Sequence, residues 1–162
     1  MKKHIIYGLL ALLAFVATAT SVKAQASPGQ EQLHSKIIDI SSAQILASNT
    51  TPVTLVTVPN ANYQIVPVSV VVHTDYKGTA YATNTTANIG FGTGTVLLTG
   101  NISLAVTADR VTAINGAFDG TQATTKGLSL IFKTASGDPV TGTGTIRVYV
   151  QYRLLNLTSA GY

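Results

Sequence analysis

His73 and Asp75 are the residues whose types and spacing come closest to a catalytic arrangement. They lie two positions apart in a segment rich in Val, so a strand would place both on one face. A histidine–carboxylate pair can activate a nucleophile that lies within its reach. The chain has no Gly-x-Ser-x-Gly motif and no cysteine, and the mature part has only one other histidine, His34. We therefore expect a solvated strand face here, no catalytic residues and no enzymatic activity.

The acidic residues do not form a metal site in the sequence. None of them has the spacing of a calcium-binding loop, and the ligands of a transition-metal site are missing. We predict no metal ion and no cofactor, although a calcium ion held by distant loops stays open as an alternative. The glycine-rich segment 90–94 has neither the lysine nor the following helix of a phosphate-binding loop, so we interpret it as an ordinary loop. The acidic residues are Glu31, Asp39, Asp75, Asp109, Asp119 and Asp138.

Tyrosine side chains are the remaining candidates for binding a ligand. An exposed aromatic ring can stack on a sugar ring, and Tyr81 and Tyr149 are the candidate glycan contacts. The alternative is that the tyrosines pack in the core or at an interface.

The segment 145–157 has the clearest strand pattern and carries the candidate interface. Apolar side chains at every second position from Ile146 to Leu154 would face the core, and the intervening ones would face solvent or a partner. This outward set combines aromatic and guanidinium groups, which are enriched at interface hot spots. The predicted interface residues are Arg147, Tyr149, Gln151 and Arg153.

The rest of the chain supplies further strands with little helix. The helix formers that follow Ser41 predict a helical turn at 41–47, and Pro67 predicts an edge position or a β-bulge. Asn115-Gly116 could close a hairpin. We predict an all-β protein, a single antiparallel β-sandwich of jelly-roll type with one short helical turn. The other predicted strands are 36–40, 53–58, 65–76, 80–91, 96–98, 102–106, 111–114 and 128–133.

The first 26 residues resemble a secretory signal peptide. A basic start and the apolar run 5–16 precede small residues at Ala24 and Ala26, and cleavage after either residue fits the pattern. We therefore expect an exported protein, in the periplasm, at the cell surface or outside the cell. The predicted organisation is a signal peptide at 1–26, a flexible lead-in at 27–35, the β-sandwich at 36–157 and a tail at 158–162.

Removing the leader changes the charge of the protein. The formal charge of +4 includes Lys2, Lys3 and Lys23, so the mature chain has 10 − 3 = 7 basic and 6 acidic residues. These basic residues are scattered, which argues against nucleic acid as a partner. Threonine, with 22 residues in the mature part, suits a polar strand surface. Without cysteine, such a chain has no disulfide and depends on packing and hydrogen bonds.

Three segments carry a resemblance to a known type of protein. They begin at Ser42, Asp75 and Gly137, and read SAQILA with TTPVTLVTVP, DYKGTAY, and GDPVTGTGTIRVYVQY. Over residues 36–157 the chain looks like small β-sandwich proteins encoded by tailed phages and related bacterial elements. The resemblance implies a virion structural or fibre-associated component. The leader departs from that pattern, because virion proteins usually assemble in the cytoplasm, so a bacterial cell-surface use stays open.

Together these features predict a non-enzymatic exported structural or attachment module. Its expected partners are further copies of itself or other surface or virion proteins, with no membrane span after the leader is removed. The alternative is a secreted, lectin-like β-sandwich that binds glycans.

Overall fold

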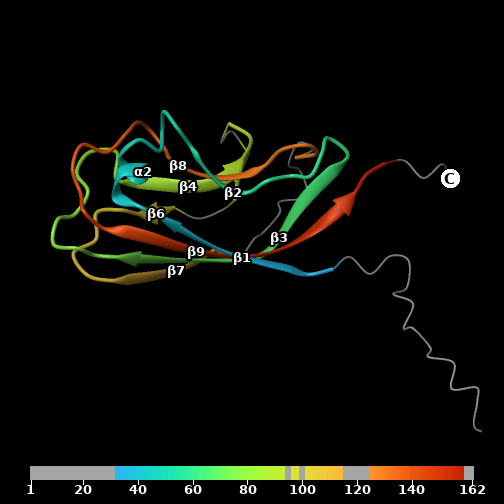
Figure 1. Ribbon diagram of the computed structural model, residues 1–162. Coiled ribbons are helices and arrows are strands. Elements are labelled where there is room, and N and C mark those ends of the chain that lie inside the picture. Colours follow the sequence, from blue (N-terminus) through green and yellow to red (C-terminus); the bar gives the residue numbers. More distant parts are fainter. Residues whose placement is uncertain (1–31, 94–95, 99–100, 115–124, 159–162) are drawn as a thin grey trace, which may run out of the picture. The chain divides into compact units, whose positions relative to one another are not determined.

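The computed structural model describes residues 32–93, 96–98, 101–114 and 125–158, which lie in a unit that spans Glu31–Tyr162 (Figure 1). Strands dominate it, and the predicted hairpin at Asn115-Gly116 lies outside the described residues. In chain order the elements are β1 (His34–Ile40), α2 (Ser42–Leu46), β2 (Val53–Val56), β3 (Tyr63–Asp75), β4 (Thr86–Phe91), β5 (Val96–Leu97), β6 (Ile102–Ser103), β7 (Arg110–Ile114), β8 (Leu130–Thr134) and β9 (Thr145–Asn156).

The strands form two antiparallel sheets that lie in two layers (Figure 1). The first sheet has the order β1-β9-β3-β7, and the second has the order β2-β8-β4-β5 with β6 also paired to β4. The pairs are nested along the chain: β1 pairs with β9, β2 with β8, β3 with β7 and β4 with β5. The chain is thus a long hairpin wound into a sandwich, which is the jelly-roll arrangement. The predicted fold is confirmed.

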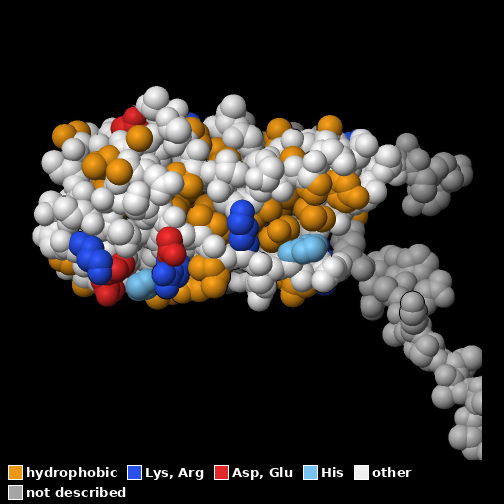
Figure 2. Space-filling model, viewed as in Figure 1, with side chains coloured by type: hydrophobic (Ala, Val, Ile, Leu, Met, Phe, Trp, Pro, Cys, Tyr) orange, Lys and Arg blue, Asp and Glu red, His pale blue; other side chains and the backbone are white. Residues whose placement is uncertain are grey.

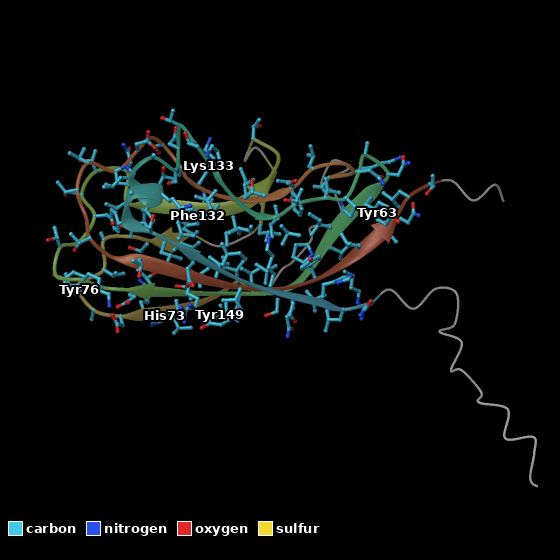
Figure 3. The ribbon with its side chains drawn as sticks, in the orientation of Figure 1. Tyr63, His73, Tyr76, Phe132, Lys133 and Tyr149 are labelled. Carbon is cyan, nitrogen blue, oxygen red and sulfur yellow. The ribbon has the colours of Figure 1, made fainter. Side chains whose placement is uncertain are left out.

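The core lies between the two sheets and is built by alternating side chains. In β9, Ile146, Val148 and Val150 are buried, while the residues between them are exposed. Phe132 of β8 enters the same core from the second sheet, between the layers (Figure 3). A residue added or lost in such a strand would turn its apolar side chains toward solvent, so alternation fixes the register against the core.

A β-bulge interrupts the pairing of β3 with β9. The register shifts between Pro67 and Ser69, so the prediction of a bulge at Pro67 is confirmed. Pro67 is buried and Val68 is 47% exposed, so Val68 does not share the buried face of Val70, which unbroken alternation along the strand would require. The extra residue at a bulge changes the phase of the side chains, which is the physical reason for the difference.

The predicted helical turn is present as α2. The side chain of Ser41 accepts a hydrogen bond from the backbone N–H of Gln44, and the side chain of Gln44 accepts one from the backbone N–H of Ser41. This capping box pairs backbone groups that a short helix leaves free. The first strand begins earlier than predicted, because His34 and Ser35 already pair with Tyr152 and Gln151 in β1.

Asp138 joins two loops that are distant in the sequence. Its carboxylate accepts hydrogen bonds from the backbone N–H of Asn49 at 2.7 Å and from the hydroxyl of Thr50 at 2.5 Å. The backbone carbonyl of Asp138 also accepts a hydrogen bond from Asn84 at 3.0 Å. The hydrogen bonds to the carboxylate favour its ionised form, with that from the Thr50 hydroxyl contributing most, and hold the pKa of Asp138 below its ordinary value.

We predict that Asp138→Asn removes an acid-sensitive part of the stability. A carboxyl whose pKa is lowered by folding stabilises the protein above its unfolded pKa of about 3.9, and this contribution disappears as the pH falls through the folded pKa. The variant should therefore be less stable than the wild type at pH 7, and the difference should shrink below pH 4. Urea denaturation between pH 3 and pH 7 checks this. A difference that is constant over that range would contradict it.

Candidate interaction surface

The outer face of the first sheet carries a row of apolar side chains that crosses all four strands. The register places Ile37 of β1 opposite Tyr149 of β9, Tyr149 opposite Val71 of β3, and Val71 opposite Ala113 of β7. We call these four residues the apolar row. Tyr149 points away from the second sheet (Figure 3), so the row faces solvent rather than the core.

The large apolar side chains exposed by the described residues are concentrated at this face. Ile37 is 62% exposed, Tyr149 39% and Val111 64%, and Val68 is exposed at the bulge of β3. Two others lie elsewhere: Val140, which is 69% exposed, lies between β8 and β9, and Leu33, which is 49% exposed, lies just before β1. Antiparallel sandwiches usually turn polar side chains outward, so a row of this kind is a candidate surface for contact with a partner.

A polar row runs beside the apolar row. In it, Asp39 of β1 lies opposite Arg147 of β9, Arg147 opposite His73 of β3, and His73 opposite Val111 of β7. The Nε of Arg147 donates a hydrogen bond to Oδ1 of Asp39 at 2.5 Å, and Nη2 donates one to Oδ2 at 3.2 Å. This pairing lowers the pKa of Asp39 and raises that of Arg147. Figure 2 shows basic, acidic and histidine side chains beside hydrophobic ones along this rim of the sandwich.

His73 and Asp75 share the outer face of β3, as predicted. Together with Asp39, Thr145 and Arg147 they line a hollow of about 130 Å³. Asp75 is bound by Nζ of Lys77 at 2.7 Å, and this bond lowers the pKa of its carboxyl. The two carboxylates of the hollow are therefore each paired with a neighbouring cation.

The predicted interface residues of β9 are all exposed on one face of the strand. The sequence did not identify Ile37, Val71, Val111 and Ala113 as part of the same surface. Their own alternation places them on outward faces, but only the register of four strands that are distant in the sequence brings them beside Tyr149. The sequence therefore predicted the residues that β9 contributes to this surface, but not those contributed by β1, β3 and β7.

Tyr81 lies in the core, so its predicted role as a glycan contact is corrected. Its side chain is 3% exposed, and its hydroxyl donates a hydrogen bond to the carbonyl of Gly144 at 2.6 Å. Burial raises the pKa of Tyr81 to about 12. A ring enclosed in this way has no face to offer a sugar, which leaves Tyr149 as the exposed ring of the two candidates.

The residues that the structure describes contain no group of three or more histidine or acidic side chains that could hold a metal ion. In the same part of the chain, no helix is long and apolar enough to cross a membrane.

Comparison with solved structures gives a distant similarity. No protein-family model matches the chain, and no curated protein matches it. Among solved structures, a chain of the "Cyanophage Pam1 capsid asymmetric unit" is similar with a TM-score of 0.46 and 14% sequence identity. The match covers 83% of this chain and 98% of that chain. A likeness this distant carries no argument about function.

We predict that Gly142→Ala destabilises the protein because Gly142 lies against the buried ring of Tyr81. Its φ of +138° disfavours any residue with a side chain, and a Cβ atom there would overlap the ring. We expect a loss of about 2–4 kcal/mol in the free energy of unfolding, measured by urea denaturation.

The matched control is Gly78→Ala. Gly78 also has a positive φ, of +97°, but a Cβ atom there would meet nothing within 4 Å. Gly78→Ala should therefore lower the free energy of unfolding through backbone strain alone, and by less than Gly142→Ala does. Equal losses in the two variants would show that the Tyr81 contact is unimportant.

Proposed function

We propose that the protein is an exported, non-enzymatic structural module that assembles with further copies of itself. The observation that carries this proposal is the apolar row, Ile37, Tyr149, Val71 and Ala113, which crosses the solvent-facing side of the first sheet. Contact with a second such surface would remove these side chains from water, which is the main favourable contribution to association.

The charges of the outer face are compatible with a second copy as the partner. The charged groups beside the apolar row are largely paired, Asp39 with Arg147 and Asp75 with Lys77. Arg153 is the additional cation of β9 on this face. Two copies would thus meet without strong repulsion, and a contact between identical faces satisfies the symmetry of a dimer.

The size of the face indicates a weak contact for each pair of copies. Four strands about 4.8 Å apart and seven residues rising about 3.4 Å each form a face of roughly 19 by 24 Å, or about 450 Å². A standard stable interface buries about 800 Å² on each partner. A single contact of this size suits an assembly in which many weak contacts act together.

The absence of enzymatic activity is part of the proposal. Catalysis by His73 would require a nucleophile and an oxyanion-stabilising group arranged around it. Thr145 contributes the only hydroxyl to the hollow among the described lining residues, and threonine nucleophiles are normally activated by an N-terminal amine. His73 and Asp75 are better explained as polar members of the binding face.

Glycan binding is the second candidate function, and the position of Tyr149 favours it. The exposed ring lies on the same face as the polar hollow, so stacking and hydrogen bonding could occur together. Binding on a glycan array that is lost in Tyr149→Ala and retained in Tyr81→Phe would favour this function over self-assembly.

Export is supported by the leader sequence. We predict that the mature protein begins at Gln25 or Ser27, because cleavage after Ala24 or after Ala26 leaves a small residue before the cut. Expression of the full chain in a bacterial host, cell fractionation and mass spectrometry of the intact protein check this. Recovery of the uncleaved chain from the cytoplasm alone would contradict it.

We predict that Tyr149→Glu weakens self-association of the mature protein at least about tenfold, because the carboxylate would be buried in an apolar contact. Light scattering from about 1 to 100 μM measures the average mass. Val140→Glu is the matched control, since it places the same charge on an exposed apolar site outside the face. A wild type that is monomeric throughout, or equal effects of the two variants, would overturn the proposal.

A further inference from the structure

The first sheet ends in an unusually accessible edge strand. Among the described residues the edge strands are β1, β7, β2, β5 and β6, with 7, 5, 4, 2 and 2 residues, so β1 is the longest. Within the described residues, β1 pairs on one side only, with β9 in an unbroken register, whereas the pairing of β2 is interrupted by a shift. A long regular edge strand presents a row of backbone groups that another strand can bind.

The charges that would normally protect such an edge are few. Lys36 and Asp39 are the charged residues of β1, apart from the titratable His34. Asp39 is bound by Arg147 of the neighbouring β9, which holds its carboxylate over the sheet. Lys36 is therefore the one charge on β1 with no ion pair among the described residues, and β1 contains neither proline nor a bulge.

We propose that β1 pairs antiparallel with β1 of a second copy, so that two four-stranded sheets become one sheet of eight strands. If a two-fold axis normal to the sheet relates the two copies, the side chains that face outward in each copy also face outward in the joined sheet. Full overlap of His34–Ile40 with its copy then places Ile37 opposite Ile37, and Ser35 opposite Asp39. In this register Ile37, which is 62% exposed, gains an apolar cross-strand neighbour.

This edge contact rests on the proposed self-assembly and gives it a geometry. Joining two sheets at β1 places two apolar rows end to end and doubles the continuous outer face from about 450 to about 900 Å². The doubled face exceeds the roughly 800 Å² per partner that a standard interface buries. Edge pairing and face packing should therefore reinforce one another. A chain with two self-complementary surfaces can also extend beyond a dimer.

The experiment separates the two contacts by disrupting each alone. Neighbouring residues of an edge strand direct their N–H groups to opposite sides, one toward the paired strand and the next toward the free edge. Of the two variants Ser35→Pro and Lys36→Pro, one therefore removes a donor from the free edge and leaves the β1–β9 hydrogen bonds intact, and the other breaks one of those bonds. The one that retains the wild-type melting temperature is the edge variant, and Tyr149→Glu is the face variant. Light scattering then gives the mass of the wild type, each variant and the double variant.

We expect a wild type larger than a dimer, a dimer for Tyr149→Glu, a weaker dimer that is populated only toward 100 μM for the edge variant, and a monomer for the double variant. A monomeric Tyr149→Glu protein would overturn the edge contact, as would a wild-type dimer that the edge proline leaves unchanged. Loss of assembly in the edge variant, with no effect of Tyr149→Glu, would instead overturn the face contact and leave the edge contact standing. A monomeric wild type would overturn both.

A disulfide cross-link tests the register without relying on proline. The chain has no cysteine, so a single one can be introduced without competition. In the Tyr149→Glu background, Ile37→Cys should cross-link on mild oxidation, because residue 37 lies opposite itself. Ser35→Cys is the control: its own copy lies about four residues away along the strand, beyond the roughly 7 Å limit between Cα atoms. No cross-link at position 37, or equal cross-linking at both positions, would overturn the proposed register.

Discussion

The antiparallel pairing of β3 with β9 is the constraint on which the rest of the sandwich depends. It extends from Tyr63 to Asp75 through the centre of the first sheet, with β1 and β7 added on either side. Because side chains alternate between the two faces, this one register decides both what enters the core and what faces outward. It places Val72 and Val148 inside, and it places Val71 beside Tyr149 on the surface. The core and the outward-facing apolar row are therefore two consequences of the same hydrogen-bonded ladder.

Patterns that are local in the sequence were enough to predict much of this fold. The alternation from Ile146 to Leu154 gave the inward and outward faces of β9, and the capping serine gave the helical turn. The apolar row was beyond reach, because Ile37 and Tyr149 are distant in the sequence and meet only through the register of β1 with β9. Tyr81 was misjudged for a similar reason. Its enclosure depends on Gly142 and Gly144, which come from a distant loop and leave room for the ring.

The jelly roll itself does not distinguish among the functions considered. The same architecture serves viral capsid proteins, lectins and enzymes, so function has to be inferred from the surface that a particular sequence builds on it. Here that surface combines apolar side chains with ion pairs that neutralise each other. Such a face is better suited to a broad contact with another protein than to the selective binding of one charged group. The low share of charged residues in the sequence, 10%, points the same way.

The nested pairing of the strands also determines where the two ends of the sandwich lie. Since β1 runs antiparallel to β9, the start of β1 at His34 lies beside Tyr152, near the end of β9, so the first strand begins on the side of the unit where the last strand ends (Figure 1). The loops fastened by Asp138 belong to a different part of the fold from this pair of strand ends. A short linker could therefore join the two ends, and new ends could be opened in a distant loop. The fold is thus open to circular permutation, which would move an attached group from one end of the sandwich to the other without changing either sheet.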